Sequence, residues 1–383
     1  MVLNVEEAVR QRYEEGAHAR EASLCCPVEY QSRYLEVLPK EILDRDYGCG
    51  DPSAFVEAGD VVLDLGSGGG KICYIASQVV GAEGKVIGVD FNDEMLDLAR
   101  RYRDEVATRV GHSNVEFRRG RIQDLRTDLD VVDEYLRECP IAGVKDLARY
   151  ESFVAAQREE RPLVASGSVD VVVSNCVLNL VDDGQKSVLM DEIFRVLRRG
   201  GRAVISDIVS DEVVPAELKA DPELWSGCVS GAFQEPAFLD AFARAGFYGI
   251  EILRRDEDPW RVVEGIEFRS VTVRAWKGKE GECLERNQAV VYRGPWSEVR
   301  DDDGHILRRG VATAVCDKTY SIYTREPYAA DVVPVDPRVP VPLEDAGVFD
   351  CARDTVRSPR ESKGLEYRET TAGSDCCGSD ECG

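Results

Sequence analysis

Three cysteines stand in short loop-like stretches that are far apart in the chain. Cys49 lies in "DYGCGDP", Cys176 in "SNCVLNL" and Cys228 in "ELWSGCVSGAF". Cys176 closely follows the apolar run 171–173, and an open α/β sheet holds its ligand at the carboxyl end of such strands. A cysteine nucleophile is normally activated by a basic partner such as histidine, but the chain has only three histidines. The scarcity of histidine therefore disfavours a nucleophilic role for these thiols.

A regular alternation of strands and helices must position these loops. The apolar run 61–65 in "VVLDLGSGGGK" breaks into glycines, and a helix over 71–80 follows, because its apolar residues recur on one face. The next strand ends at Asp90, after which Asn92 or Asp93 can cap a helix. Further strands are predicted in "NVEFRRGRIQDL", "SVDVVVSN" and "RAVISDIV", with the amphipathic helix "QKSVLMDEIFRVLRRGG" before the last. The alternation predicts an α/β fold with a Rossmann-like, doubly wound parallel sheet over about residues 61–210.

Two carboxylates accompany the glycine-rich turn. Asp90, at the end of the second strand, can accept hydrogen bonds from both hydroxyls of a ribose. The turn is G-S-G-G-G preceded by Asp64, and a carboxylate beside the turn suits a cationic ligand better than a diphosphate. This pattern, with "GVD" at the second strand, resembles the S-adenosylmethionine-dependent methyltransferases with a Rossmann-like fold. The alternative is a glycine turn that serves the fold alone.

The three cysteine loops can lie next to such a cofactor. Cys49 precedes the first strand and Cys228 follows the fifth, so both loops can fold over the edge that carries Cys176. Three thiols next to a sulfonium suggest a site for a soft atom. These stretches, with "DIVSDEVVP" and "EPAFLDAFARAGF", resemble the arsenite methyltransferase family across most of residues 20–280. The resemblance implies transfer of the methyl group of S-adenosylmethionine to trivalent arsenic, arsenite and then methylarsenite, in arsenic detoxification.

The chemistry of arsenic accounts for three thiols without a general base. Trivalent arsenic is thiophilic, as other soft ions are, and it keeps a lone pair that makes it the nucleophile. Cys49, Cys176 and Cys228 are therefore the expected catalytic residues and arsenic ligands, a pyramid that leaves the lone pair facing the methyl group. Structural zinc, which usually takes four ligands, is the competing interpretation. The resemblance further implies that Cys49 and Cys176 close to a disulfide, which a thioredoxin- or glutathione-type reductant reopens.

The resemblance also implies contacts with the cofactor. Tyr47 is expected to help cover it, and Ile122 to lie near the adenine with Gln123 beside it. Together with the turn and the strand ends, the expected cofactor site comprises Tyr47, Asp64, Gly66, Gly68, Gly70, Asp90, Phe91, Asn92, Met95, Ile122, Gln123 and Asn175. Either Cys25 or Cys26, in "ASLCCPVEY", corresponds to an N-terminal thiol of the family that relays arsenite inward or is inert.

Changes in composition predict five regions. Residues 1–60 form a helical segment with Cys25, Cys26 and the Cys49 loop, and residues 61–210 form the S-adenosylmethionine-binding domain, with a polar two-helix insertion at about 126–167. Residues 211–280 form the arsenic-binding segment with Cys228, and residues 281–345 a small β-rich domain around an Asp-Gly turn. Residues 346–383 are polar and end in "TTAGSDCCGSDECG", which predicts disorder. For Cys376, Cys377 and Cys382 on this tail there are two alternatives: they capture arsenite, or they have no role in its methylation.

Charge and cysteine usage narrow the function further. The formal net charge of −24 disfavours a nucleic-acid partner or an anionic membrane surface. No run of about 18 apolar residues is found, and the N-terminus lacks the apolar core of a signal peptide, so we expect a cytoplasmic protein, as a monomer that binds arsenite and its thiol conjugates. Thirteen cysteines are too dilute for a disulfide scaffold, and Cys73, Cys139 and Cys316 are expected to be small buried hydrophobes.

Two other functions remain compatible with these patterns. One is a small-molecule C- or O-methyltransferase in which the thiols are incidental. The other is a non-catalytic metalloid-binding protein, which would bind arsenite tightly without turning over a cofactor.

Overall fold

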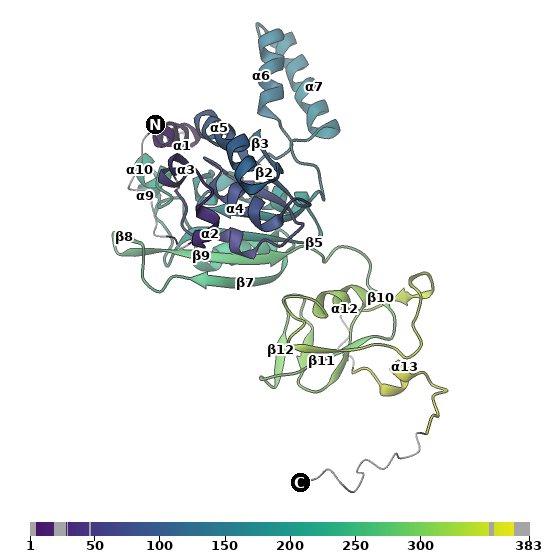
Figure 1. Ribbon diagram of the computed structural model, residues 1–383. Helices are drawn as coiled ribbons and strands as arrows, with labels where there is room; N and C mark the ends of the chain where they lie inside the picture. The colour runs from purple at the N-terminus through teal and green to yellow at the C-terminus, as the bar shows by residue number, and fades with distance from the viewer. Residues whose placement is uncertain (1–4, 19–27, 29, 46, 352–355, 371–383) are drawn as a thin grey trace. The chain divides into compact units, whose positions relative to one another are not determined.

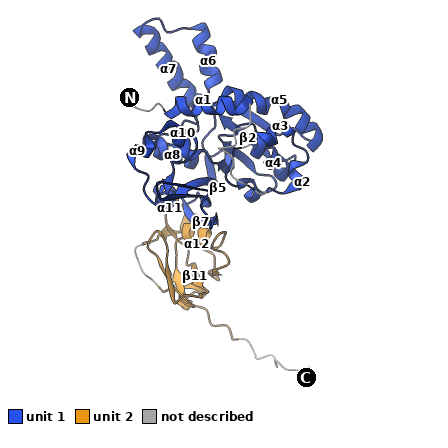
Figure 2. Ribbon diagram, turned by 90° about the vertical axis from the view of Figure 1, so that its left-hand side faces the viewer, with its two compact units in different colours: residues 1–278 blue, residues 279–383 orange. Residues whose placement is uncertain are grey.

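The computed structural model describes residues 5–18, 28, 30–45, 47–351 and 356–370. The chain divides into two compact units, Met1–Gly278 and Lys279–Gly383, coloured blue and orange in Figure 2. Each unit has a core and a sheet system of its own, so the two are described separately.

The first unit is built on one sheet with the strand order β3-β2-β1-β4-β5-β9-β7. Five of its strands are parallel to one another: β1 (Val61–Leu65), β2 (Lys85–Asp90), β3 (Val115–Arg119), β4 (Val169–Asn175) and β5 (Leu197–Ser210). The strands β9 (Ile266–Trp276) and β7 (Tyr248–Arg255) extend it antiparallel, and short β6 (Phe233–Gln234) and β8 (Arg261–Val263) pair with β5 and β9. The Rossmann-like prediction is confirmed, but the complete sheet is mixed, and residues 211–278 continue it.

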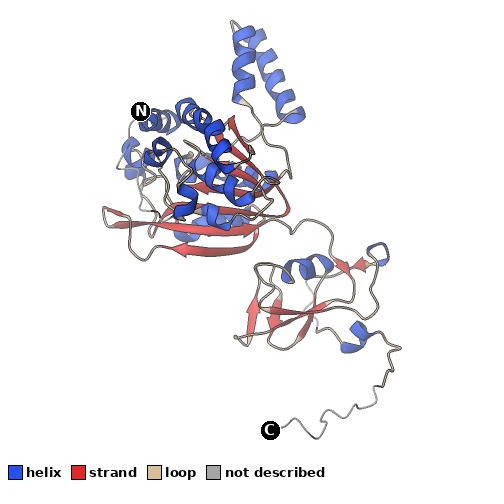
Figure 3. Cartoon of the chain, viewed as in Figure 1, coloured by secondary structure: helices blue, strands red, loops and turns tan. Residues whose placement is uncertain are grey.

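Helices cover both faces of this sheet (Figures 1 and 3). The main ones are α4 (Lys71–Val80), α5 (Asp93–Val110), α8 (Lys186–Val196) and α11 (Glu235–Arg244). Successive residues of β1 point to opposite faces: Val62 packs in the cluster that contains α4, and Leu63 in the cluster that contains α8 and α11. The predicted helix over 71–80 is confirmed. The helix α8 is shorter than the predicted segment "QKSVLMDEIFRVLRRGG", because Leu197 already pairs with Val169 of β4.

The insertion between β3 and β4 contains the two helices α6 (Leu129–Glu138) and α7 (Val144–Glu160). They form a hairpin (Figure 1) in which the rings of Tyr135 and Phe153 stack with their centroids 4.1 Å apart. Cys139 follows α6 directly and is exposed, so the expectation that it is buried was wrong. It ends a helix whose only core-facing residue is Val132, and nothing packs over the turn behind it.

The N-terminal helix and several short elements complete the first unit. They are α1 (Val5–His18), α2 (Ser32–Leu35), α3 (Lys40–Asp44), α9 (Ala216–Lys219), α10 (Pro222–Ser226) and the single turns η2 (Pro52–Phe55), η3 (Leu178–Leu180) and η4 (Asp183–Gln185). The helix α1 lies against α10 (Figure 1), where Arg12 Nη1 donates to the carbonyl of Glu223 at 2.8 Å. The N-terminal segment therefore forms a wall over the ligand edge of the sheet.

The second unit consists of small antiparallel sheets. The strand β11 (Ala289–Tyr292) lies between β14 (Ala312–Ala314) and β15 (Val332–Val335), β12 (Glu298–Arg300) pairs with β13 (Ile306–Arg308), and β10 (Leu284–Glu285) pairs with β16 (Gly347–Val348). The helices are α12 (Asp317–Tyr323) and α13 (Pro359–Lys363), with the turn η5 (Leu343–Asp345).

The disorder predicted from residue 346 onward is wrong for the described part of that segment. It contains β16 and α13, and both Phe349 and Arg357 are buried. Arg357 donates to both carboxylate oxygens of Glu285, at 2.7 and 3.0 Å. The polar composition of this segment was misleading, because ion pairs and backbone pairing stabilise its structure. A run of apolar residues is not what orders it.

Candidate active site

A cavity of about 350 Å³ lies at the carboxyl ends of β1, β2 and β4. The strand order reverses between β1 and β4, and ligands of open α/β sheets bind at such a switch point. The glycine turn after β1, the start of α5, the residues after β4 and the helix α1 all contribute to its lining. The volume lies in the range of small-molecule and cofactor pockets.

The glycine turn forms one wall of this cavity. Gly66 has a φ of 69°, a conformation that favours glycine, and a side chain at this position would overlap Val177. Asp90 lies beside the turn, where its two carboxylate oxygens accept hydrogen bonds from the backbone N–H of Gly68 at 2.8 Å and of Asn92 at 2.9 Å. These bonds hold the carboxylate in place at the end of β2, although burial raises its pKa.

Most of the expected cofactor residues line the cavity. They are Tyr47, Asp64, Gly66, Gly68, Asp90, Phe91, Asn92, Met95, Ile122, Gln123 and Asn175. Gly70 does not: a side chain there would meet the ring of Phe117 at 2.7 Å, so this glycine permits the packing of α4 against β3. The lining combines two buried carboxylates, Asp64 and Asp90, with apolar walls. This combination fits a ligand that is cationic at one end and has a flat apolar ring at the other.

Helix α1 supplies a wall that the sequence did not reveal. Val5, Glu6, Val9 and Tyr13 line the cavity, and Glu6 forms an ion pair of 2.7 Å with Arg121 beside Ile122. Tyr13 is partly buried, and its hydroxyl lies 4.0 Å from the sulfur of Cys228. The spacing of Val9 and Tyr13 by one helical turn was the available signal, but such a pair is typical of any amphipathic helix.

The structure brings Cys49, Cys176 and Cys228 into one buried cluster. The sulfurs of Cys49 and Cys176 and a carboxylate oxygen of Asp207 all lie within 4.8 Å of one another. The thiol of Cys228 donates a hydrogen bond to the carbonyl oxygen of Cys176, with a distance of 3.0 Å from sulfur to oxygen. Because Cys176 also lines the cavity, the thiol cluster adjoins the space where a cofactor would lie.

Two of the three cysteines have an unusual backbone conformation. Cys176 has a φ of 64° and Cys228 a φ of 59°, the left-handed region that costs an ordinary L-residue about 1–2 kcal/mol. The turn at Cys176 is held by a hydrogen bond of 2.8 Å from its N–H to the carbonyl of Ser206. Strained residues of this kind cluster at active sites, and here the strain turns two thiols toward a common point.

The third thiol, Cys49, is positioned by Asn175 at the end of β4. The side-chain oxygen of Asn175 accepts hydrogen bonds from the N–H of Cys49 at 2.9 Å and of Gly50 at 3.0 Å, and its amide donates to the carbonyl of Gly50 at 2.8 Å. A side chain at Gly48 would overlap Asn175, and one at Gly50 would lie 2.6 Å from Ser206 Oγ. The glycines on both sides of Cys49 thus allow its loop to sit directly on the sheet edge.

Asp207 is the functional residue that the sequence analysis missed. It is fully buried in β5, and burial raises its pKa to about 7, although hydrogen bonds from Ile208, Leu178 and Asn179 oppose this rise. The bonds from the N–H of Leu178 (2.9 Å) and the side chain of Asn179 (2.8 Å) fix the turn behind Cys176. Its signal was one acidic residue inside the apolar strand "VISDIV".

The pKa values of two thiols of the cluster, Cys176 and Cys228, are raised above their usual range. The hydrogen bond with Cys176 and burial raise the pKa of Cys228 well above its usual range, and the negative charge of Asp207 adds to the rise. The pKa of Cys176 is also raised, since its bond with Cys49, burial and nearby charge outweigh the opposing bond with Cys228. A ligand that replaces protons at these sulfurs must therefore bring its own proton acceptors. Cys25, Cys26, Cys376, Cys377 and Cys382 lie outside the described residues.

Comparisons with known proteins place this site in a class. A family model described as "Methyltransferase domain" matches residues 56–152 and 151–286, and another, described as "Domain of unknown function", matches residues 279–367. With its switch-point cavity, the first unit is the Rossmann-like domain of an S-adenosylmethionine-dependent methyltransferase, and S-adenosylmethionine is its cofactor.

The chain belongs to the arsenite methyltransferase family. It is 32% identical over 316 residues to the arsenite methyltransferase of Aquipseudomonas alcaligenes, covering 78% of this chain and 80% of the relative. It is 28% identical over 366 residues to that of Mus musculus, covering 91% and 88%. The crystal structure of an arsenic (III) S-adenosylmethionine methyltransferase from Chlamydomonas reinhardtii superposes with a TM-score of 0.55 at 27% identity, covering 85% of this chain and 100% of that one.

None of the helices in the described ranges combines the length and the apolar composition that crossing a membrane requires.

Proposed function

We propose that this protein methylates trivalent arsenic that is held by Cys49, Cys176 and Cys228, with S-adenosylmethionine as the methyl donor. The observation that carries the proposal is the convergence of three buried thiols beside the switch-point cavity, two of them on strained backbone.

Binding of the substrate follows from the state of the thiols. Arsenous acid carries three hydroxyls, and each leaves as water with the proton of one thiol while an As–S bond forms. Three As–O bonds are exchanged for three As–S bonds, and arsenic stays trivalent. Neutral thiols suit this exchange, because the hydroxyls of the substrate take up their protons. Bonds of about 2.3 Å, as for zinc and thiolate, draw the three sulfurs to within about 4 Å of one another.

The residues around the thiols orient the substrate. Asn175 holds the Cys49 loop, Asp207 holds the turn behind Cys176, and Tyr13 of α1 covers Cys228. The thiols are almost excluded from water, with exposures of 4–5%. Positioning of this kind contributes several kcal/mol to a transfer reaction. The lone pair of arsenic faces away from its three sulfurs, toward the cavity that Cys176 lines.

The opposite wall holds the cofactor. When bound, S-adenosylmethionine supplies an electrophilic methyl group on a sulfonium. Asp90 is positioned to accept the ribose hydroxyls, the N–H groups of the glycine turn approach the ligand closely, and Asp64 favours its positive charge. Phe91, Met95 and Ile122 provide the apolar surface for the adenine.

A reductant completes the cycle. Methylation uses the arsenic lone pair and leaves arsenic formally pentavalent, so return to the trivalent state takes two electrons. Cys49 and Cys176 lie close enough to supply them by joining in a disulfide, which a thioredoxin- or glutathione-type thiol then reduces. The free thiols of the described cysteines fit a reducing compartment such as the cytoplasm. The catalytic cluster lies within one chain, which is compatible with a monomer.

Product analysis tests the proposal. The protein is incubated with arsenite, a thiol and S-adenosylmethionine, and arsenic species and S-adenosylhomocysteine are both quantified. We expect methylated arsenic, with one S-adenosylhomocysteine released for each methyl group transferred to arsenic. Arsenite binding without S-adenosylhomocysteine would mean a metalloid-binding protein, and turnover only on carbon or oxygen acceptors would mean a different methyltransferase.

A further inference from the structure

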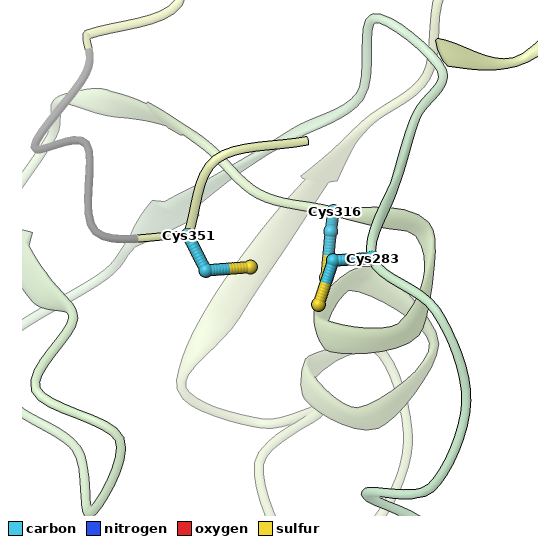
Figure 4. Close-up of side chains that lie close together, drawn as sticks. All are labelled: Cys283, Cys316 and Cys351. Carbon is cyan, nitrogen blue, oxygen red and sulfur yellow. The ribbon is translucent and has the colours of Figure 1, made fainter. Parts of the chain in front are cut away.

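A second group of three thiols lies entirely within the C-terminal unit. The sulfurs of Cys283, Cys316 and Cys351 are all within 4.8 Å of one another. Figure 4 shows Cys316 and Cys283 side by side at the start of a helix, with the side chain of Cys351 pointing toward them from a separate segment. All three are free thiols, and the methyltransferase cavity involves none of them.

Backbone pairing brings these cysteines together from distant parts of the chain. Cys283 directly precedes β10, and Cys351 follows β16, its antiparallel partner. The N–H of Phe349 donates to the carbonyl of Cys283 at 2.8 Å, which joins the two segments beside the thiols. Cys316 directly precedes α12, and its sulfur accepts a hydrogen bond from the N–H of Thr319 at 3.3 Å. The cluster is thus a product of the fold of this unit.

The surroundings suit a ligand that enters from solvent and binds sulfur. Cys316 is fully buried against Ala314 and Phe349, whereas Cys283 and Cys351 are partly exposed. Burial raises the pKa of the Cys283 thiol, but hydrogen bonds from Cys351 and Cys316 and the charge of Lys318 outweigh burial and lower it overall.

The three cysteine ligands of this cluster fit trivalent arsenic better than zinc. Structural zinc is almost always held by four protein ligands, and among the described residues this group offers three. Trivalent arsenic takes three thiolates in a pyramid, and its fourth position is occupied by a lone pair. Sulfurs about 4 Å apart are required, which small rotations of the partly exposed Cys283 and Cys351 side chains provide.

We propose that Cys283, Cys316 and Cys351 form a second binding site for trivalent arsenic, separate from the methyl-transfer site. The exchange is the same in form: three hydroxyls of arsenous acid leave as three waters with the thiol protons, three As–S bonds form, and nothing is oxidised or reduced. This inference does not depend on the proposed function of the Cys49 cluster.

Alkylation of the unmodified full chain tests the site without any substitution. The protein is treated with iodoacetamide, with and without arsenite, and the modified cysteines are identified by mass spectrometry. We expect arsenite to protect Cys283 and Cys351 together, over one concentration range, while the exposed Cys139 reacts equally in both samples. Protection of neither residue, or of only one, would overturn the proposal.

Stoichiometry in full-length variants separates the two sites. In a background with serine at Cys25, Cys26, Cys376, Cys377 and Cys382, we expect two arsenic atoms per chain after removal of free arsenite. Cys283→Ser/Cys316→Ser/Cys351→Ser should leave one, and Cys49→Ser/Cys176→Ser/Cys228→Ser should also leave one. X-ray absorption on the latter variant should show three sulfur neighbours of arsenic at about 2.3 Å.

The arsenic content of the variants shows which of the two proposed sites is absent. Loss of the Cys49 cluster that removes all bound arsenic would overturn the second site and leave the first intact. Loss of the Cys283 cluster that removes all bound arsenic would overturn the proposed function instead. Zinc that copurifies at one equivalent with the Cys283 cluster and is not displaced by arsenite would also overturn the second site.

Discussion

Replacing Asn175 by alanine should uncouple the methylation of arsenite from that of methylarsenite. Arsenite needs all three thiols, whereas methylarsenite already carries one carbon on arsenic and accepts only two sulfurs. Asn175 makes three hydrogen bonds to the segment Cys49–Gly50, of 2.8 to 3.0 Å. The substitution therefore frees the one thiol that the binding and methylation of methylarsenite do not require, because the reduction by Cys49 and Cys176 comes after methyl transfer.

The magnitude follows from the bonds that are lost. Each contributes about 1 kcal/mol net, so the Cys49 loop loses roughly 3 kcal/mol of preference for its present position. Since about 1.4 kcal/mol corresponds to a factor of ten, the equilibrium constant for the Cys49 loop in its present position falls about a hundredfold. We expect kcat/KM to fall by a similar factor for arsenite and by less than about threefold for methylarsenite.

Asn114→Ala is the matched control. The side chain of Asn114 also makes three hydrogen bonds, to Ser77 and to the carbonyls of Gly81 and Gly84, but far from the cavity. It should lower stability without changing the ratio of the two activities. Calorimetry with S-adenosylmethionine shows whether Asn175→Ala has damaged the cofactor site. An unchanged arsenite-to-methylarsenite ratio in Asn175→Ala would refute the role assigned to this clamp.

Three further predictions concern the remaining parts of the site. Gly48→Ala, whose new methyl group overlaps Asn175, should reduce arsenite turnover more than methylarsenite turnover in the same assay, and equal loss on both would contradict it. Asp90→Ala should weaken S-adenosylmethionine binding by about 1.5–3 kcal/mol, and calorimetry showing unchanged affinity would mean that the ribose is held elsewhere. The folded carboxyl of Asp207, with its pKa of about 7 instead of 3.8, keeps a proton that the unfolded chain has lost, so the free energy of unfolding should fall as pH rises from about 4 to 7. Asp207→Asn should remove up to about 4 kcal/mol of this decrease in the free energy of unfolding, as measured by urea unfolding at a series of pH values. The same dependence of the unfolding free energy on pH in both proteins would contradict the raised pKa of Asp207.

The part of the fold that the sequence predicts well is the parallel sheet. Strands covered on both faces are nearly continuous apolar runs, so β1 and β4 stand out, and the glycine turn with Asp90 marks the cofactor edge. The antiparallel β9 and β7 join β5 through pairing across the sheet, which a local sequence pattern does not encode.

The parts of the site that escaped prediction depend on tertiary contacts. Asp207 is one acidic residue in a strand and gains its role only from the turn that it holds. The left-handed backbone of Cys176 and Cys228 leaves no trace in residue type, because glycine is the usual residue there. Cys283, Cys316 and Cys351 are far apart in the chain, and only the pairing of β10 with β16 and the start of α12 unite them.

The most direct test of the account is the turnover of Cys176→Ser, since this thiol contacts both of the other two and lines the cavity. The variant exchanges a soft sulfur for a hard hydroxyl at nearly the same shape, and Cys139→Ser, at an exposed position outside the site, is its control. The account predicts that Cys176→Ser stays folded, binds S-adenosylmethionine and loses nearly all methylation of arsenite, while Cys139→Ser keeps it. Wild-type turnover by Cys176→Ser on both arsenite and methylarsenite would contradict the claim that this thiol holds the substrate.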